Sequence, residues 1–154
     1  MSMPTWLIHS LQIVLALLVG VATACQPSVN AKFALHTPSR LYGGLLNFAV
    51  GLLAMIVVLL VIRPPAATVS QVSQAPWWSW TGGLLGAFFV TMSVFLVPTM
   101  GAAVFVSVVV ASQLSAAAVI DHFGLLDQAV RSLTWGRCVG VALMFAGVAC
   151  IRLL

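Results

Sequence analysis

The sequence predicts an all-α, polytopic membrane protein of five transmembrane helices, and two observations carry that prediction. Hydrophobic residues make up 62% of the chain, while Asp, Glu, Lys and Arg together make up only 5%. A soluble domain carries about 25% charged residues, so this chain cannot cover a surface that faces water. Five apolar stretches each reach the roughly 20 helical residues needed to cross about 30 Å of hydrocarbon. Residues 1–154 are therefore predicted to form a single transmembrane domain.

Each predicted helix is bounded by residues that break helices. The first begins near Trp6, and the second ends where Arg63-Pro64-Pro65 cannot continue a helix. The stretch Trp77–Ile120 would be about 66 Å of continuous helix, too long for one span. A hairpin is therefore predicted at residues 98–101, with the third helix stopping before Pro98. The predicted helices are residues 6–33, 41–62, 77–97, 101–120 and 135–154.

The membrane surface has its own signals in the sequence. Amphipathic indole rings prefer the level of the lipid headgroups. All five tryptophans fall at predicted helix ends, namely Trp6, Trp77, Trp78, Trp80 and Trp135. Residues 11–24 resemble the apolar core of a secretory signal, but no Lys or Arg precedes them. That segment is therefore expected to be a retained helix.

The basic residues indicate how the chain inserts into the membrane. Orientation depends mainly on Lys and Arg in short loops. Arg63, Arg131 and Arg137 fall on the side of the N-terminus, and Lys32, Arg40 and Arg152 fall on the other. This three-to-three balance predicts insertion in both orientations. With an odd number of helices, two opposite copies can pair into an antiparallel ten-helix homodimer. The alternative is an accidental balance, with the first helix or a partner fixing one topology.

Several classes of function find no support in the sequence. The basic residues are scattered rather than clustered on one face, which argues against nucleic-acid binding. The three cysteines, Cys25, Cys138 and Cys150, are far apart and odd in number, which fits neither a disulfide framework nor a metal site. No nucleophile–base pair or glycine-rich phosphate loop is present. No enzyme activity, cofactor or metal is therefore expected.

The candidate substrate-binding residues are uncharged polar side chains within apolar segments. Gln26 and Asn30 are four residues apart and share a helix face, and Pro27 between them is expected to bend the helix. A broken helix beside polar groups is typical of transporter sites. The alternative is that these residues cap the first helix at the headgroups.

The fourth predicted helix carries the leading candidate, Gln113, beside Ser112 and near mid-span. An amide at that depth is costly unless it is paired or hydrated, so it is a functional candidate by default. Asp121 and His122, at the predicted end of this helix, are candidates for a gate or boundary pair. A solvated helix end is the alternative for these two residues.

Small residues at helical spacing predict close approach between helices. Asn47 in the second helix and Ser93 in the third are further substrate candidates, although helix packing is the favoured role for Asn47. The glycines are predicted to serve helix packing, those of the last helix at the dimer contact: Gly43, Gly51, Gly82, Gly86, Gly136, Gly140 and Gly147.

Three segments together resemble a known transporter family. They are Gln26-Pro27-Ser28-Val29-Asn30-Ala31, the segment from Pro76 to Gly86, and Ser112-Gln113-Leu114 followed by Asp121-His122-Phe123-Gly124-Leu125. In order and spacing they are similar to the five-helix YdcZ-like family of the drug/metabolite transporter (DMT) superfamily, over nearly the whole chain.

This resemblance implies a small-molecule secondary transporter or exporter of the DMT type. It would work in the bacterial inner (cytoplasmic) membrane as a dual-topology homodimer, equivalent to the inverted repeat of larger transporters. Its partners would be a second copy, membrane lipid and a small organic substrate. The first helix lacks the glutamate of the related small multidrug resistance proteins, so their proton coupling does not carry over. The alternatives are a dual-topology ion channel and a non-transporting subunit of a paralogous partner.

Overall fold

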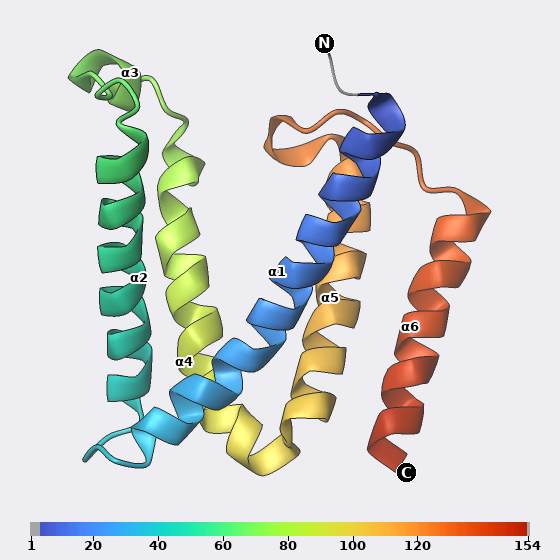
Figure 1. Ribbon diagram of the computed structural model, residues 1–154. Coiled ribbons are helices and arrows are strands. Elements are labelled where there is room, and N and C mark those ends of the chain that lie inside the picture. The colour runs from blue at the N-terminus through green and yellow to red at the C-terminus, as the bar shows by residue number, and fades with distance from the viewer. Residues whose placement is uncertain (1–3, 154) are drawn as a thin grey trace. The chain divides into compact units, whose positions relative to one another are not determined.

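The computed structural model describes residues 4–153, and all of its regular secondary structure is helical (Figure 1). Five helices in the described chain are long and apolar enough to cross a membrane, which confirms the predicted all-α, five-span architecture. They are α1 (Thr5–Ala34), α2 (Leu41–Ile62), α4 (Gly82–Met100, preceded by the 3₁₀ helix η1, Trp77–Thr81), α5 (Ala102–Phe123) and α6 (Trp135–Leu153). Leu154, which the sequence assigns to the last helix, lies outside the described residues.

The chain divides into two compact units, one ending at Pro98 and the other beginning at Thr99. The first contains α1, α2 and most of α4. The second contains α5 and α6, together with the short 3₁₀ helix η2 (Leu125–Asp127). The two units are described separately below.

The core of the first unit lies where the end of α1, the start of α2 and the later part of α4 meet. Its buried apolar residues are Ala31, Ala34, Val90, Val94 and Val97. Gly43 on α2 makes this close meeting possible. A Cβ atom at Gly43 would lie 2.6 Å from the backbone oxygen of Asn30 and 3.0 Å from Cγ1 of Val94. Small residues therefore let the helix backbones come into contact, as is usual between membrane helices.

Helix α1 continues through Pro27, which lies inside it and is fully buried. Proline lacks the amide proton of the helix ladder and crowds the carbonyl four residues earlier, here that of Thr23. The ribbon of α1 changes direction in its C-terminal part (Figure 1). Because the helix does not end at Pro27, Gln26 and Asn30 stay one turn apart on the same helix, and both can face α2.

Two predicted helix ends need correction. The sequence predicts that the third helix stops before Pro98, but α4 runs to Met100 with Pro98 inside its last turns. Proline removes one hydrogen bond without preventing the next residues from staying helical. The break instead lies at Gly101, whose φ of 83° is accessible mainly to glycine. Helix α5 extends to Phe123, where Gly124 adopts the left-handed conformation with φ 62°. Asp121 and His122 therefore belong to its last turn.

The segment after α2 contains a short helix, α3 (Val69–Ser73), that the apolar pattern does not predict. Its signal is a capping box in the order Thr-x-x-Gln. The Thr68 side chain accepts a hydrogen bond from the Gln71 amide, and the Gln71 side chain accepts one from the Thr68 amide. This reciprocal arrangement is a recognised helix start.

Candidate functional site

A groove of about 640 Å³ runs along the first unit between α1 and α2. Its walls combine three carboxamide side chains with small and apolar residues. The lining residues are Ala22, Cys25, Gln26, Val29 and Asn30 from α1, and Leu46, Asn47, Phe48, Val50, Gly51, Leu52, Ala54 and Met55 from α2. The groove therefore brings together three predicted substrate residues: Gln26, Asn30 and Asn47.

Gln26 and Asn47 join the two helices through their side chains. Nε2 of Gln26 donates a hydrogen bond of 2.8 Å to Oδ1 of Asn47. Both residues are only partly buried. Asn47 follows Leu41, the first residue of α2, by six positions, which places it about 9 Å along the helix axis. Because α2 is about 33 Å long, this amide pair lies within the apolar span rather than at its edge.

Asn30 lies nearer to the end of the first unit where α2 begins. Its backbone oxygen faces Gly43, only about 3 Å along α2 from Leu41. The residue is 7% exposed, and its Nδ2 atom is buried with no hydrogen-bond partner among the described residues. A buried donor without a partner typically costs about 1–3 kcal/mol. Asn30 therefore lines the groove at its polar end, near the start of α2, while its Nδ2 donor is buried without a partner in the described chain.

The deep end of the groove is apolar. It reaches Leu52, Ala54 and Met55, and Met55 lies about 21 Å along α2 from its first residue. Among the lining residues of the described chain there is no Asp, Glu, Lys, Arg or His. The groove is thus polar but uncharged at the end near the start of α2, and apolar towards the middle of the span.

The remaining substrate candidates are not among the residues that line this groove. Ser93 is 1% exposed in the core of the first unit, and its hydroxyl donates to the backbone oxygen of Val90 at 2.8 Å. Ser112 and Gln113 belong to α5 in the second unit, and both are exposed. The Ser112 hydroxyl donates to the backbone oxygen of Val108 at 2.9 Å. The structure therefore groups the amides of α1 and α2, and it does not bring Ser93 into their groove.

The glycines assigned to helix packing differ in their surroundings. Gly43 lies in the tight contact described above, and a Cβ at Gly86 would be 3.8 Å from the ring of Phe48, an ordinary contact distance. At Gly136 the added atom would meet only the Thr134 hydroxyl at 4.0 Å within the described structure. An added Cβ would meet nothing within 4 Å among the described residues at Gly51, Gly82, Gly140 and Gly147. A role for Gly136, Gly140 and Gly147 in contacts between copies stays a prediction, as does the helix-packing role of Gly51 and Gly82.

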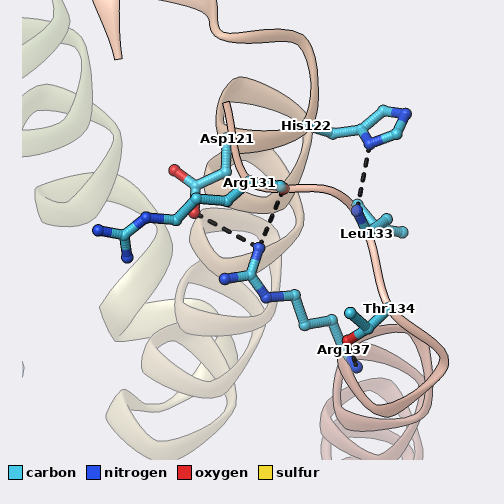
Figure 2. Close-up of polar contacts among 6 residues, drawn as sticks. All are labelled: Asp121, His122, Arg131, Leu133, Thr134 and Arg137. Atoms are coloured by element: carbon cyan, nitrogen blue, oxygen red, sulfur yellow. Dashed lines mark hydrogen bonds and ion pairs between the residues drawn. The ribbon is translucent and has the colours of Figure 1, made fainter. Parts of the chain in front are cut away.

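A charged cluster joins the end of α5 to the start of α6 in the second unit (Figure 2). Nη1 of Arg137 lies 3.7 Å from a carboxylate oxygen of Asp121 and donates to the backbone oxygen of Arg131 at 3.2 Å. Nδ1 of His122 accepts a hydrogen bond of 3.2 Å from the Leu133 amide. Asp121 and His122 thus hold the connecting segment in place. The sequence analysis did not identify Arg137 as the partner of Asp121, because the two residues are sixteen positions apart in the chain.

Comparisons with known proteins agree with this architecture. Residues 11–150 match the family model described as "Putative inner membrane exporter, YdcZ". The inner membrane protein YdcZ of Escherichia coli (strain K12) is 30% identical over 139 residues, which cover 90% of this chain and 93% of that protein. No solved structure matches the chain. The five spanning helices and the family match together establish that this chain belongs to the YdcZ family and is a multi-pass protein of the bacterial inner membrane.

Proposed function

We propose that this protein exports small organic molecules across the inner membrane, and that two oppositely inserted copies form each transporter. The family match supports an export role at the coarse level. The equal division of six basic residues supports insertion in both orientations. An odd number of spans makes opposite copies antiparallel, which is the arrangement that inverted repeats provide within one chain.

The observation that carries the export proposal is the groove between α1 and α2. Binding sites in transporters lie within the membrane thickness, beside irregular helix segments and polar groups. The groove contains the amide pair Gln26–Asn47, and beside Pro27 it contains the buried amide of Asn30, which has no partner among the described residues. We assign first contact with substrate to these three amides.

The same groove supports a transporter over an ion channel. Ion pathways are built from rings of carbonyl oxygens or charged side chains. The groove-lining residues of the described chain carry no charge. The proposal requires no catalytic chemistry and no cofactor.

Export can be tested before the substrate is identified. Bacterial cells would express the wild type, Asn30→Leu or the control Thr23→Val, and the small molecules in the medium would be compared by mass spectrometry. Thr23 is an exposed α1 residue outside the groove lining, and its hydroxyl donates to backbone oxygens of its own helix. We expect at least one compound to accumulate outside cells with the wild type and Thr23→Val but not with Asn30→Leu. Equal membrane amounts of the three proteins would be verified by immunoblot. Identical media for all three strains would contradict the proposal.

A further inference from the structure

A second cavity lies within the second unit, between the end of α5 and the start of α6. It has a volume of about 260 Å³, and Asp121 and Arg137 line one end of it. We call this cavity the α5–α6 cleft. The rest of its lining is apolar and consists of Leu114, Ala117, Ala118, Gly140 and Val141.

The α5–α6 cleft runs from the ends of these helices towards the middle of the span. Asp121 lies two residues before the end of α5, and Arg137 lies two residues after the start of α6. Leu114 precedes Asp121 by seven residues, which places it about 10 Å deeper along the helix axis. Trp135 begins α6 and is 87% exposed, as expected of an indole ring among lipid headgroups. The charged end of the cleft is therefore expected at the headgroups, and its apolar part in the hydrocarbon.

The apolar part of the cleft has room for a hydrocarbon chain. A Cβ atom added at Gly140 would meet nothing within 4 Å among the described residues. On the α5 side, Ala117 and Ala118 present only methyl groups. An acyl chain can therefore lie between the two helices, in contact with Gly140.

The two charged side chains at the end of the cleft keep most of their hydrogen-bonding capacity (Figure 2). Nη1 of Arg137 lies 3.7 Å from a carboxylate oxygen of Asp121, beyond the 2.7–2.9 Å of a direct charge-assisted hydrogen bond. The guanidinium has five N–H donors, and one hydrogen bond, to the backbone oxygen of Arg131, is formed within the described chain. The Asp121 carboxylate accepts no hydrogen bond from the described residues. Because the Arg137 and Asp121 side chains are 39% and 36% exposed, a ligand can reach both.

We propose that the α5–α6 cleft binds a phospholipid whose headgroup carries both a phosphate and a primary ammonium group, as phosphatidylethanolamine does. The phosphate accepts hydrogen bonds from the planar guanidinium of Arg137, and the ammonium donates to the Asp121 carboxylate. One acyl chain lies in the apolar part of the cleft. The site contains none of the amides assigned to substrate, so the inference does not depend on the proposed function.

The pairing of opposite charges sets the preference among lipids. Basic pockets between transmembrane helices are typical sites for phosphate-bearing headgroups. A carboxylate in the same cleft favours a headgroup that also carries a positive charge and N–H donors. The quaternary ammonium of phosphatidylcholine has no N–H group, and the headgroup of phosphatidylglycerol has no positive charge. Both should therefore bind more weakly than phosphatidylethanolamine.

Native mass spectrometry of the purified full-length protein in detergent can measure this preference, because each bound lipid adds its own mass. Phosphatidylethanolamine, phosphatidylcholine and phosphatidylglycerol would be compared, all with dioleoyl chains. They share the acyl chains and the phosphate and differ only at the end of the headgroup. Glycerophosphoethanolamine, which is the headgroup without acyl chains, would be added as a competitor. The same spectra report whether the protein is a monomer or a dimer.

We expect phosphatidylethanolamine to bind the wild type about tenfold more tightly than either other lipid, the factor that one hydrogen bond to a charged group typically contributes. Asp121→Asn keeps the side-chain size but removes the charge, so it should abolish most of this preference. Arg137→Gln should weaken binding of all three lipids, because each presents a phosphate.

A third variant, Gly140→Leu, places a side chain in the cleft and should weaken binding of all three lipids. Gly147→Leu is the matched control, two turns later on α6 and outside the cleft lining, where an added Cβ also meets nothing within 4 Å in the described chain. It should bind lipids as the wild type does. Circular dichroism would verify that each variant is folded, and Asp121→Asn decides the question if Gly140→Leu is not.

Several results would overturn the inference. Equal binding of phosphatidylethanolamine and phosphatidylcholine, or an unchanged preference in folded Asp121→Asn, would remove the role of the carboxylate. Wild-type lipid binding by folded Gly140→Leu would place the lipid outside the cleft. Competition by glycerophosphoethanolamine at the concentrations of the intact lipid would make the cleft a site for a water-soluble zwitterion. Conversion of a dimer to a monomer by Gly140→Leu would mean that a second copy of the chain covers the cleft.

Discussion

The close approach of α1 and α2 at Gly43 predicts that a single methyl group there destabilises the protein. In Gly43→Ala the added carbon would lie 2.6 Å from the backbone oxygen of Asn30, 3.0 Å from Cγ1 of Val94 and 3.1 Å from Cβ of Ala34. Carbon atoms pack best about 3.5–4.0 Å apart. The nearest of these atoms belongs to backbone and cannot rotate away, so the helices must separate.

The magnitude follows from two opposing effects. Overpacking of a tight contact typically costs about 1–3 kcal/mol, while replacing Gly by Ala within a helix gains about 0.8–1 kcal/mol. Gly43→Ala should therefore lower the free energy of unfolding by up to about 2 kcal/mol. Gly51→Ala is the matched control, two turns later on α2, where an added Cβ meets nothing within 4 Å in the described structure. It should be neutral or stabilising by up to about 1 kcal/mol.

The assay is equilibrium unfolding of the detergent-solubilised protein, followed by circular dichroism for the wild type and both variants. We expect Gly43→Ala below the wild type and Gly51→Ala at or above it. Because the Gly43 contact involves the backbone of Asn30, Gly43→Ala should also weaken binding in the groove. A Gly43→Ala protein as stable as Gly51→Ala would refute the reasoning.

Two further predictions concern the polar residues of each unit. Gln26→Leu removes the hydrogen-bond partner of Asn47 and should destabilise the protein by about 1–2 kcal/mol. The double variant Gln26→Leu/Asn47→Leu should recover part of that loss. Strictly additive effects of the two substitutions in unfolding experiments would mean that the two side chains are not coupled. Binding in the groove should change little between about pH 6 and pH 8, the range set by the reference pKa values of histidine and carboxyl groups, because its lining in the described chain holds no carboxylate or imidazole. Binding measured across that range in the wild type and in Asp121→Asn tests this expectation. A strong pH dependence that the substitution abolishes would make Asp121 a coupling site.

The sequence is sufficient to predict the five spans because apolarity and length are properties of each segment alone. Helix ends are harder to predict, since they depend on backbone details. Pro98 suggests a stop, yet its effect is limited to one hydrogen bond, and the break lies at Gly101, where φ is positive. The helix that begins after Thr68 has a local signal, the capping box, but it is too short to show an apolar period.

The candidate site is harder to predict because it depends on how helices rotate against one another. Spacing places Gln26 and Asn30 on one face of α1, but it cannot say which face of α2 they meet. The Gln26–Asn47 bond and the unpaired donor of Asn30 in the described chain emerge only from the packed helices. Gln113 is the leading candidate from sequence because of its expected depth, and the structure places it on the exposed surface of α5 in the second unit.

The account depends most directly on insertion of the chain in both orientations, which a topology reporter fused to the C-terminus can measure. The reporter should give signal on both sides of the membrane in the wild type, because three basic residues fall on each side. Adding two lysines beside Arg40 should shift the population to one orientation. Copies inserted in one orientation cannot form the antiparallel pair, so that variant alone should not export. Coexpression with a second variant, which carries the added lysines beside Arg63, should restore export. A wild-type signal confined to one side of the membrane would contradict the antiparallel transporter.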